Sequence, residues 1–144
     1  MAYATLADLE RRLRSTELVQ IADLDEDGVA DADVVADALA DAGNEIDAYL
    51  SGRYDLPLNP VPDLVTLWAV FIARYRLWSA KDDMPDLVRT NYQDAIRQLT
   101  MVQRGDIILE SAAKAEPAER ASQAVRGTTA AKVFAGGGLK GFLS

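Results

Sequence analysis

The stretch PDLVTLWAVFIARYRLWSA, residues 62–80, is apolar nearly all round when it is drawn as a helix. A helix without a polar face is either the buried centre of a helical bundle or gives one of its faces to a neighbouring subunit. Its residues Trp68, Tyr75 and Trp78 recur at helical spacing, which is more typical of a packed core than of a ligand cage. We therefore expect the chain to fold around this segment.

Helical periodicity also governs the sequence on both sides of this segment. Thr5 and Asp8 have the spacing of a capping box that opens a first helix. Gly105 follows the last periodic segment, in the position where a glycine typically ends a helix. No segment alternates convincingly between apolar and polar residues as a half-buried strand does. The sequence predicts an all-α fold, a small bundle of four main helices over residues 5–13, 31–51, 62–80 and 85–104, with a short helical segment at 17–22.

The composition excludes many functions. The 144 residues carry a net charge of −8 and include neither histidine nor cysteine, which excludes His-dependent nucleophiles, His/Cys zinc sites and disulfides. No pair of carboxylates stands in a recognisable catalytic setting, so we expect a protein that is not an enzyme. The acidic balance argues against a dedicated duplex-DNA binder. The longest strongly apolar run, residues 64–72, is too short to span a membrane, and no signal peptide is visible, so we expect a cytoplasm-like compartment and no membrane partner.

Charge divides the chain into two parts. Residues 1–110 carry 21 acidic and 10 basic side chains, whereas residues 111–144 carry 2 acidic and 5 basic ones, so the net charges are −11 and +3. We expect an acidic helical body over residues 1–109 and an extended, flexible, Gly/Ala-rich basic C-terminal arm over residues 110–144. Such an arm either orders on a protein partner or folds back on the body. Its expected contact residues are apolar: Val133, Phe134, Leu139, Phe142 and Leu143.

The motif DLDEDGVAD, residues 23–31, has the spacing of an EF-hand calcium loop. Asp23, Asp25 and Asp27 stand at positions 1, 3 and 5, and the glycine at position 6 permits a sharp turn. Val29 can offer its backbone carbonyl, and Asp31 can bind an ion directly or through water. The motif therefore predicts a calcium site made from these five residues.

One departure weakens the calcium interpretation. Position 12 of the loop is Val34, where an EF-hand has a bidentate glutamate, so two ligand oxygens are missing and any calcium affinity should be weak. The alternative is a solvated polar turn in which Asp31 or Asp33 caps the following helix.

A second candidate contact surface lies in the segment RYDLPLNPVPD, residues 53–63. Its three prolines exclude regular helix. We expect Leu56 and Leu58 to be exposed on this loop and available to a protein partner.

Several segments together resemble a family of small proteins encoded beside the capsid genes of Mu-like phages and prophages. The resemblance covers nearly the whole chain. It rests on the combination of MAYATLADL, DLDEDGVAD, EIDAYLSGRYDLPL, IARYRLW, YQDAIRQLTMVQRGDI and VFAGGGLKGF. Members are similar to the helical head-completion or connector proteins of long-tailed phages. The resemblance implies a ring of twelve subunits between portal and tail, and it does not imply an enzyme.

The leading hypothesis is a structural head–tail connector of the virion, assembled in the host cytoplasm. Its partners would be further copies of itself, the portal protein, and a tail-completion or tail-terminator protein. DNA would pass through the ring without specific binding, because an acidic lumen repels phosphates. The alternatives are a tail-completion or assembly factor of the same phage, and a small acidic calcium-binding adaptor.

Overall fold

The computed structural model describes residues 2–110, and residues 1 and 111–144 lie outside the described part. Within the described residues the chain forms helices and no β-strand, which confirms the all-α prediction. The predicted short segment at 17–22 is a helix in its own right. The helices are α1 (Leu6–Arg12), α2 (Ser15–Ala22), α3 (Ala32–Leu50), α4 (Asp63–Trp78) and α5 (Asp86–Arg104).

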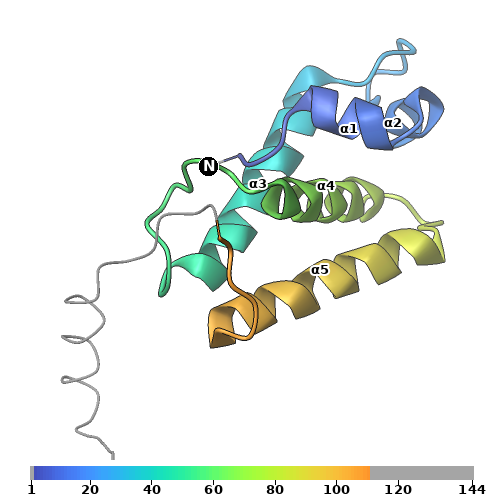
Figure 1. Ribbon diagram of the computed structural model, residues 1–144. Helices are drawn as coiled ribbons and strands as arrows, with labels where there is room; N and C mark the ends of the chain where they lie inside the picture. The colour runs from blue at the N-terminus through green and yellow to red at the C-terminus, as the bar shows by residue number, and fades with distance from the viewer. Residues whose placement is uncertain (1, 111–144) are drawn as a thin grey trace, which may run out of the picture. The chain divides into compact units, whose positions relative to one another are not determined.

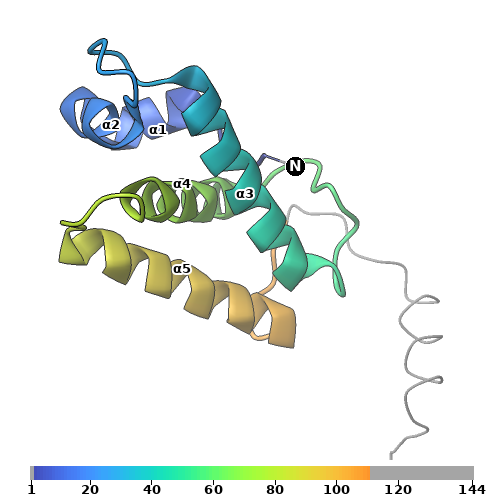
Figure 2. The same cartoon turned by 180° about the vertical axis from the view of Figure 1, so that it is seen from behind.

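Helix α4 is the centre of the bundle. It packs against each of the other four helices. Figures 1 and 2 show α3 crossing one side of α4, with α1 and α2 beyond one edge and α5 beyond the other. Val65, Trp68 and Ile72 on α4 are each at most 1% exposed. The apolar sequence of this segment is therefore explained first by burial, because a central helix needs apolar side chains toward all its neighbours.

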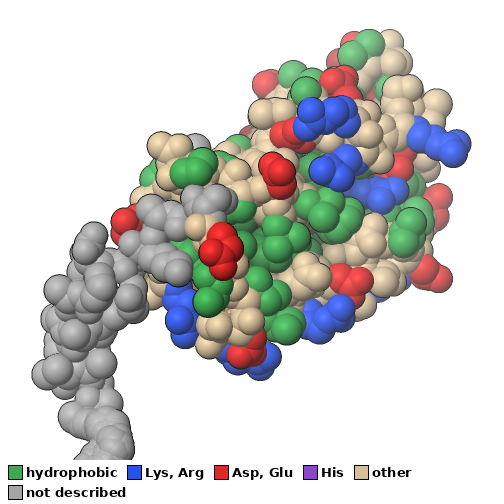
Figure 3. Space-filling model, viewed as in Figure 1, with side chains coloured by type: hydrophobic (Ala, Val, Ile, Leu, Met, Phe, Trp, Pro, Cys, Tyr) green, Lys and Arg blue, Asp and Glu red, His purple; other side chains and the backbone are tan. Residues whose placement is uncertain are grey.

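One side of α4 nevertheless faces outward. Leu64 is 37% exposed, and Leu67 and Phe71 are half-buried, which places one apolar residue per turn on the surface. We call these three residues the α4 outer face. Figure 3 shows hydrophobic side chains gathered there, between α1 and α5. The central position of α4 confirms the first alternative drawn from the sequence, and contact of this face with a neighbouring subunit stays a prediction.

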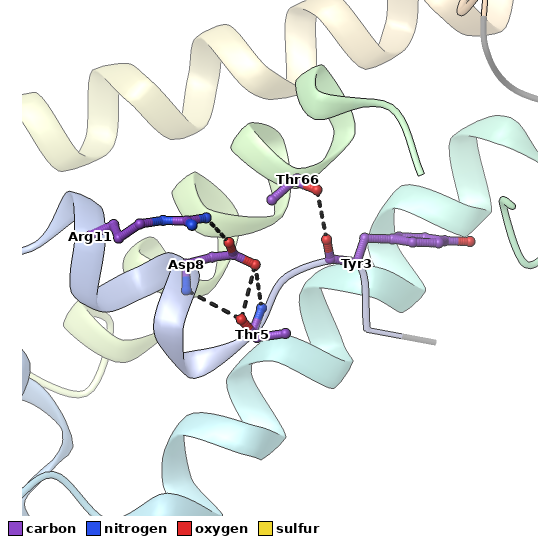
Figure 4. A network of polar contacts seen from close by, with 5 residues as sticks. All are labelled: Tyr3, Thr5, Asp8, Arg11 and Thr66. Atoms are coloured by element: carbon purple, nitrogen blue, oxygen red, sulfur yellow. Dashed lines mark hydrogen bonds and ion pairs between the residues drawn. The ribbon is translucent and has the colours of Figure 1, made fainter. Parts of the chain in front are cut away.

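The predicted capping box at the start of α1 is present. Asp8 accepts a hydrogen bond from the backbone N–H of Thr5 at 2.8 Å, and the Thr5 hydroxyl accepts one from the backbone N–H of Asp8 at 3.3 Å. Figure 4 shows this pair, together with Arg11, which forms an ion pair with Asp8. The backbone N–H of Thr5 and the nearby arginines hold the pKa of Asp8 below its usual value. The chain before the helix is also anchored, because the Thr66 hydroxyl donates to the carbonyl of Tyr3 at 3.0 Å.

Gly105 ends α5 as the sequence predicts. It has a φ of +89°, the left-handed region that glycine adopts without a steric cost. An added Cβ would lie 3.0 Å from the guanidinium of Arg53, whose Nε donates to the carbonyl of Gln103 at 2.7 Å. The backbone conformation therefore requires glycine here, whereas the exposed guanidinium of Arg53 would have to shift to admit a Cβ.

Replacing Gly105 with alanine should lower the free energy of unfolding by about 1–2 kcal/mol, because an L-residue is strained at positive φ. Urea unfolding followed by circular dichroism measures the change. Gly52→Ala is the matched control, since nothing lies within 4 Å of a Cβ there and its φ is ordinary. That variant should be neutral or gain about 0.4–1 kcal/mol. Equal changes in unfolding free energy for the two variants would contradict the need for glycine at position 105.

Candidate functional site

The acidic loop between α2 and α3 brings its carboxylates together. Oxygen atoms of Asp23, Asp25, Asp27 and Asp31 all lie within 4.8 Å of one another. Gly28 has a φ of +87°, which confirms the sharp turn expected at position 6. Four of the five predicted calcium ligands therefore converge on one point. Carboxylate oxygens in such an arrangement are the ligands that calcium prefers.

Backbone N–H groups of the loop itself hold these carboxylates in place. Asp23 accepts from Gly28 at 2.8 Å and from Asp27 at 3.2 Å. Asp31 stands at the N-cap position of α3, but its carboxylate accepts from the N–H of Leu24 at 2.8 Å instead of capping that helix. The loop is thus a closed set of side-chain to backbone hydrogen bonds, of the kind that Asp favours in turns.

The close approach of the carboxylates changes their acidity. The hydrogen bond with Asp23 raises the pKa of Asp25, and partial desolvation and the charges of Asp27 and Asp31 act in the same direction. Desolvation opposes ionisation of Asp23, but hydrogen bonds, chiefly from the N–H of Gly28, lower its pKa overall. Asp25 is therefore protonated more readily than Asp23, and a bound cation would favour the ionised form of both.

Val34, at position 12, is half-buried on α3 and packs against the core. The side chain at this position is therefore part of the helix packing and supplies no ligand oxygen. Val29 is 63% exposed, and its carbonyl remains the fifth predicted ligand.

Calcium should bind this loop weakly, with a dissociation constant on the order of 10⁻⁴–10⁻³ M, because the bidentate ligand is missing. Titration calorimetry and the melting temperature in millimolar calcium measure it. The variant Asp25→Asn/Asp27→Asn should lose the heat and the thermal shift. Asp37→Asn, an exposed change on α3 outside the loop, should keep both. Absence of heat and of a thermal shift in the unchanged chain would leave the loop as a polar turn.

Other polar groups join helices that are far apart in sequence. Glu17 on α2 accepts two hydrogen bonds from the guanidinium of Arg74 on α4, at 2.6 and 2.9 Å. It also accepts one from the indole N–H of Trp78 at 2.9 Å. Burial opposes ionisation of Glu17, but these three donors and the charge of Arg74 lower its pKa overall. The residue pattern alone did not predict this cluster. The sequence clue to the cluster is the arginine at position 74 within a mostly apolar helix, because a partly buried charge needs a partner.

A second polar cluster ties α3 to α4 and α5. Glu45 accepts from Arg76 at 2.7 Å and from the hydroxyl of Tyr92 at 2.8 Å. The ring of Tyr92 stacks on Tyr75 with centroids 3.9 Å apart. Burial and the hydrogen bond to Glu45 raise the pKa of Tyr92 to about 12. Tyr75 is thus a packing residue, as the sequence predicts, and both polar clusters serve to hold the helices together.

The ion pair of Glu17 should make stability depend on pH. A carboxylate with a lowered pKa in the folded state stabilises fully above its unfolded value, near 4.5, and loses that contribution as the pH falls through the folded value. Glu17→Gln should cost about 2 kcal/mol at pH 7, a typical value for a hydrogen bond to a charged group.

Urea unfolding at pH 7 and at pH 3 tests this pH dependence. The difference in stability between Glu17→Gln and the unchanged chain should shrink at the lower pH. Glu10→Gln, an exposed change on α1, is the control and should cost little at either pH. A difference that stays constant between the two pH values would contradict the role of the Glu17 charge.

The prediction that Leu58 is exposed is wrong. Leu58 is 1% exposed, and its backbone N–H donates to the hydroxyl of Tyr3 at 3.2 Å, which turns the loop inward. The same hydroxyl donates to Asp47 at 2.5 Å, and burial with this bond raises the pKa of Tyr3 to about 12. Leu56 is half-buried against the core.

The predicted contacts of the arm lie outside the described residues: Val133, Phe134, Leu139, Phe142 and Leu143.

The described residues define a small acidic all-α protein, held together by a central apolar helix and inter-helix ion pairs. None of its described helices is both long and apolar enough to cross a membrane. The chain belongs to the Bacteriophage Mu, Gp36 family, whose model matches residues 3–126. This confirms the resemblance to Mu-like phage proteins.

Two relatives illustrate the match. The Mu-like prophage FluMu protein gp36 of Haemophilus influenzae (strain ATCC 51907 / DSM 11121 / KW20 / Rd) is 38% identical over 141 residues, which cover 98% of each chain. Gene product J of Escherichia phage Mu is 35% identical over 120 residues, which cover 81% of this chain and 84% of the relative. The similarity therefore extends through the whole described body.

Proposed function

We propose that this chain is a structural head–tail connector, or head-completion, subunit of a Mu-like tailed phage. It would act without catalysis, as one of twelve copies in a ring at the head–tail junction of the virion, after assembly in the host cytoplasm. Its partners would be the portal protein on one side and a tail-completion or tail-terminator protein on the other. Membership of the Mu Gp36 family is the observation that carries this proposal.

The described body supports a structural role. Its strongest polar interactions, around Glu17 and Glu45, each join separate helices and so make the body rigid. A subunit that transmits force between a head and a tail needs such a body. The net charge of −11 over residues 1–110 also suits a ring through which DNA passes, because acidic walls repel phosphates and prevent specific binding.

Mass measurement of the purified chain, alone and mixed with the portal protein of the same phage, tests the proposal. A connector should give a complex of portal and ring whose mass corresponds to twelve added subunits. Binding to a tail protein without binding to portal would instead support a tail-completion or assembly factor. Failure to bind either component would reject both functions.

The acidic loop favours one second candidate, a small calcium-binding adaptor, because four carboxylates converge in it. In that case Asp25→Ala and Asp27→Ala should abolish function. In a connector these substitutions should leave binding to portal intact, so the same mass measurement on the variants separates the two candidates.

A further inference from the structure

The α4 outer face has the character of a contact surface. Leu64, Leu67 and Phe71 are one helical turn apart. Leu64 is exposed and Leu67 is half-buried, whereas Phe71 also packs against the core cluster. Figure 3 shows basic side chains beside this apolar patch on the side of α1 and α2, with acidic side chains also at its border. Exposed Arg11 and Arg12 belong to α1. An apolar strip with a charged rim is the usual composition of a protein–protein contact.

The opposite side of the body has the complementary character. Figures 1 and 2 show that α3 crosses α4 on the side away from the α4 outer face. The exposed residues Ala36, Asp37, Ala40 and Asp41 form its outer face, which we call the α3 outer face. Its alanines allow another helix to approach closely, since interaxial distance depends on side-chain size at the contact.

The carboxylates of the α3 outer face form no ion pair with a basic side chain within residues 2–110, although Arg76 borders the same surface hollow as Asp41. Asp37 and Asp41 stand four residues apart on the helix, where like charges repel, and neither forms an ion pair with a described basic side chain. Arginines beside an incoming apolar strip would relieve that repulsion. The two faces are therefore complementary in charge, and the small alanines leave room for the apolar strip.

We propose that the α4 outer face of one copy receives the α3 outer face of a second copy. Because the two faces differ and lie on opposite sides of the body, the contact is head-to-tail, and each copy has one free face left for the next. Head-to-tail contacts close into a ring when the rotation between copies permits it. This inference rests on the proposed function, since it names the contact between neighbouring subunits of the ring.

Cysteine cross-linking tests the contact directly, because the natural chain has no cysteine. One full-length variant carries Leu67→Cys and another carries Ala40→Cys, and they are mixed under mild oxidation. A head-to-tail contact gives the mixed disulfide dimer, while either variant alone gives little product. The pair Leu64→Cys and Ala36→Cys repeats the test at neighbouring positions. Ile108→Cys, 53% exposed and on neither face, is the control for random collision.

Two results would overturn the inference. Leu67→Cys dimers in excess of the mixed dimer would show that α4 pairs with its own counterpart around a two-fold axis. Mixed dimer no more abundant than that formed with Ile108→Cys would show that the faces do not meet. Mass measurement with portal tests the connector function separately. If the chain joins portal but this cross-link does not form, the connector function stands and the proposed contact is rejected.

Discussion

Replacing Trp68 with alanine should cost about 3–5 kcal/mol of unfolding free energy, which is the usual range for truncation of a buried aromatic side chain. Trp68 is 1% exposed at the centre of α4. Its indole N–H donates to the side-chain oxygen of Gln98 on α5 at 2.7 Å, so the variant loses packing and an inter-helix bond together. Domains of this size are stable by only about 5–15 kcal/mol, so the variant should lose a large fraction of its stability.

Trp68→Phe separates these two contributions. It retains most of the apolar volume and removes the donor to Gln98, which is half-buried and can turn toward water. A loss of about 1–2 kcal/mol is expected, smaller than for alanine. Urea midpoints of the two variants, compared with the unchanged chain, measure the difference. A loss below about 1 kcal/mol for Trp68→Ala would contradict the central position of α4.

The central role of α4 could be predicted because its sequence has no polar face, and a helix of that composition must be buried on most sides. The capping box at Thr5 and the end of α5 at Gly105 could be predicted for a different reason. Each depends on residues within a few positions of one another, and local spacing is visible in a sequence. The convergence of carboxylates in the acidic loop could be predicted for the same reason, since residues 23–31 form one short continuous loop.

Leu58 shows where sequence reasoning stops. Prolines on both sides favour a surface loop, yet its N–H bonds to a tyrosine hydroxyl 55 residues away. Glu17 and Arg74, 57 residues apart, are a similar case. Such pairs depend on how helices cross, and nothing in either segment alone specifies the partner. The α4 outer face is intermediate, because the sequence indicates an apolar surplus but only the packing shows which residues remain outside.

Deletion of residues 126–144 should abolish production of infectious particles, leaving heads filled with DNA and lacking tails. The described core extends from Tyr3 to Leu109, so the shortened chain should keep the fold and melting temperature of its body. The deleted segment contains apolar residues that a connector would use to reach a neighbouring subunit, the portal or a tail component. Electron microscopy of lysates, with plaque counts in a complementation assay, measures the effect.

Two matched variants identify what the segment contributes. Phe134→Ser/Phe142→Ser removes apolar anchors and should reproduce the deletion. Lys132→Gln/Lys140→Gln removes charge alone and should reduce the yield of particles only modestly, because exposed ion pairs contribute little at physiological salt. If the lysine variant were as defective as the deletion, charge would be the principal contact of the segment. Normal tailed particles from the deletion would instead place the contacts with portal and tail entirely on the helical body.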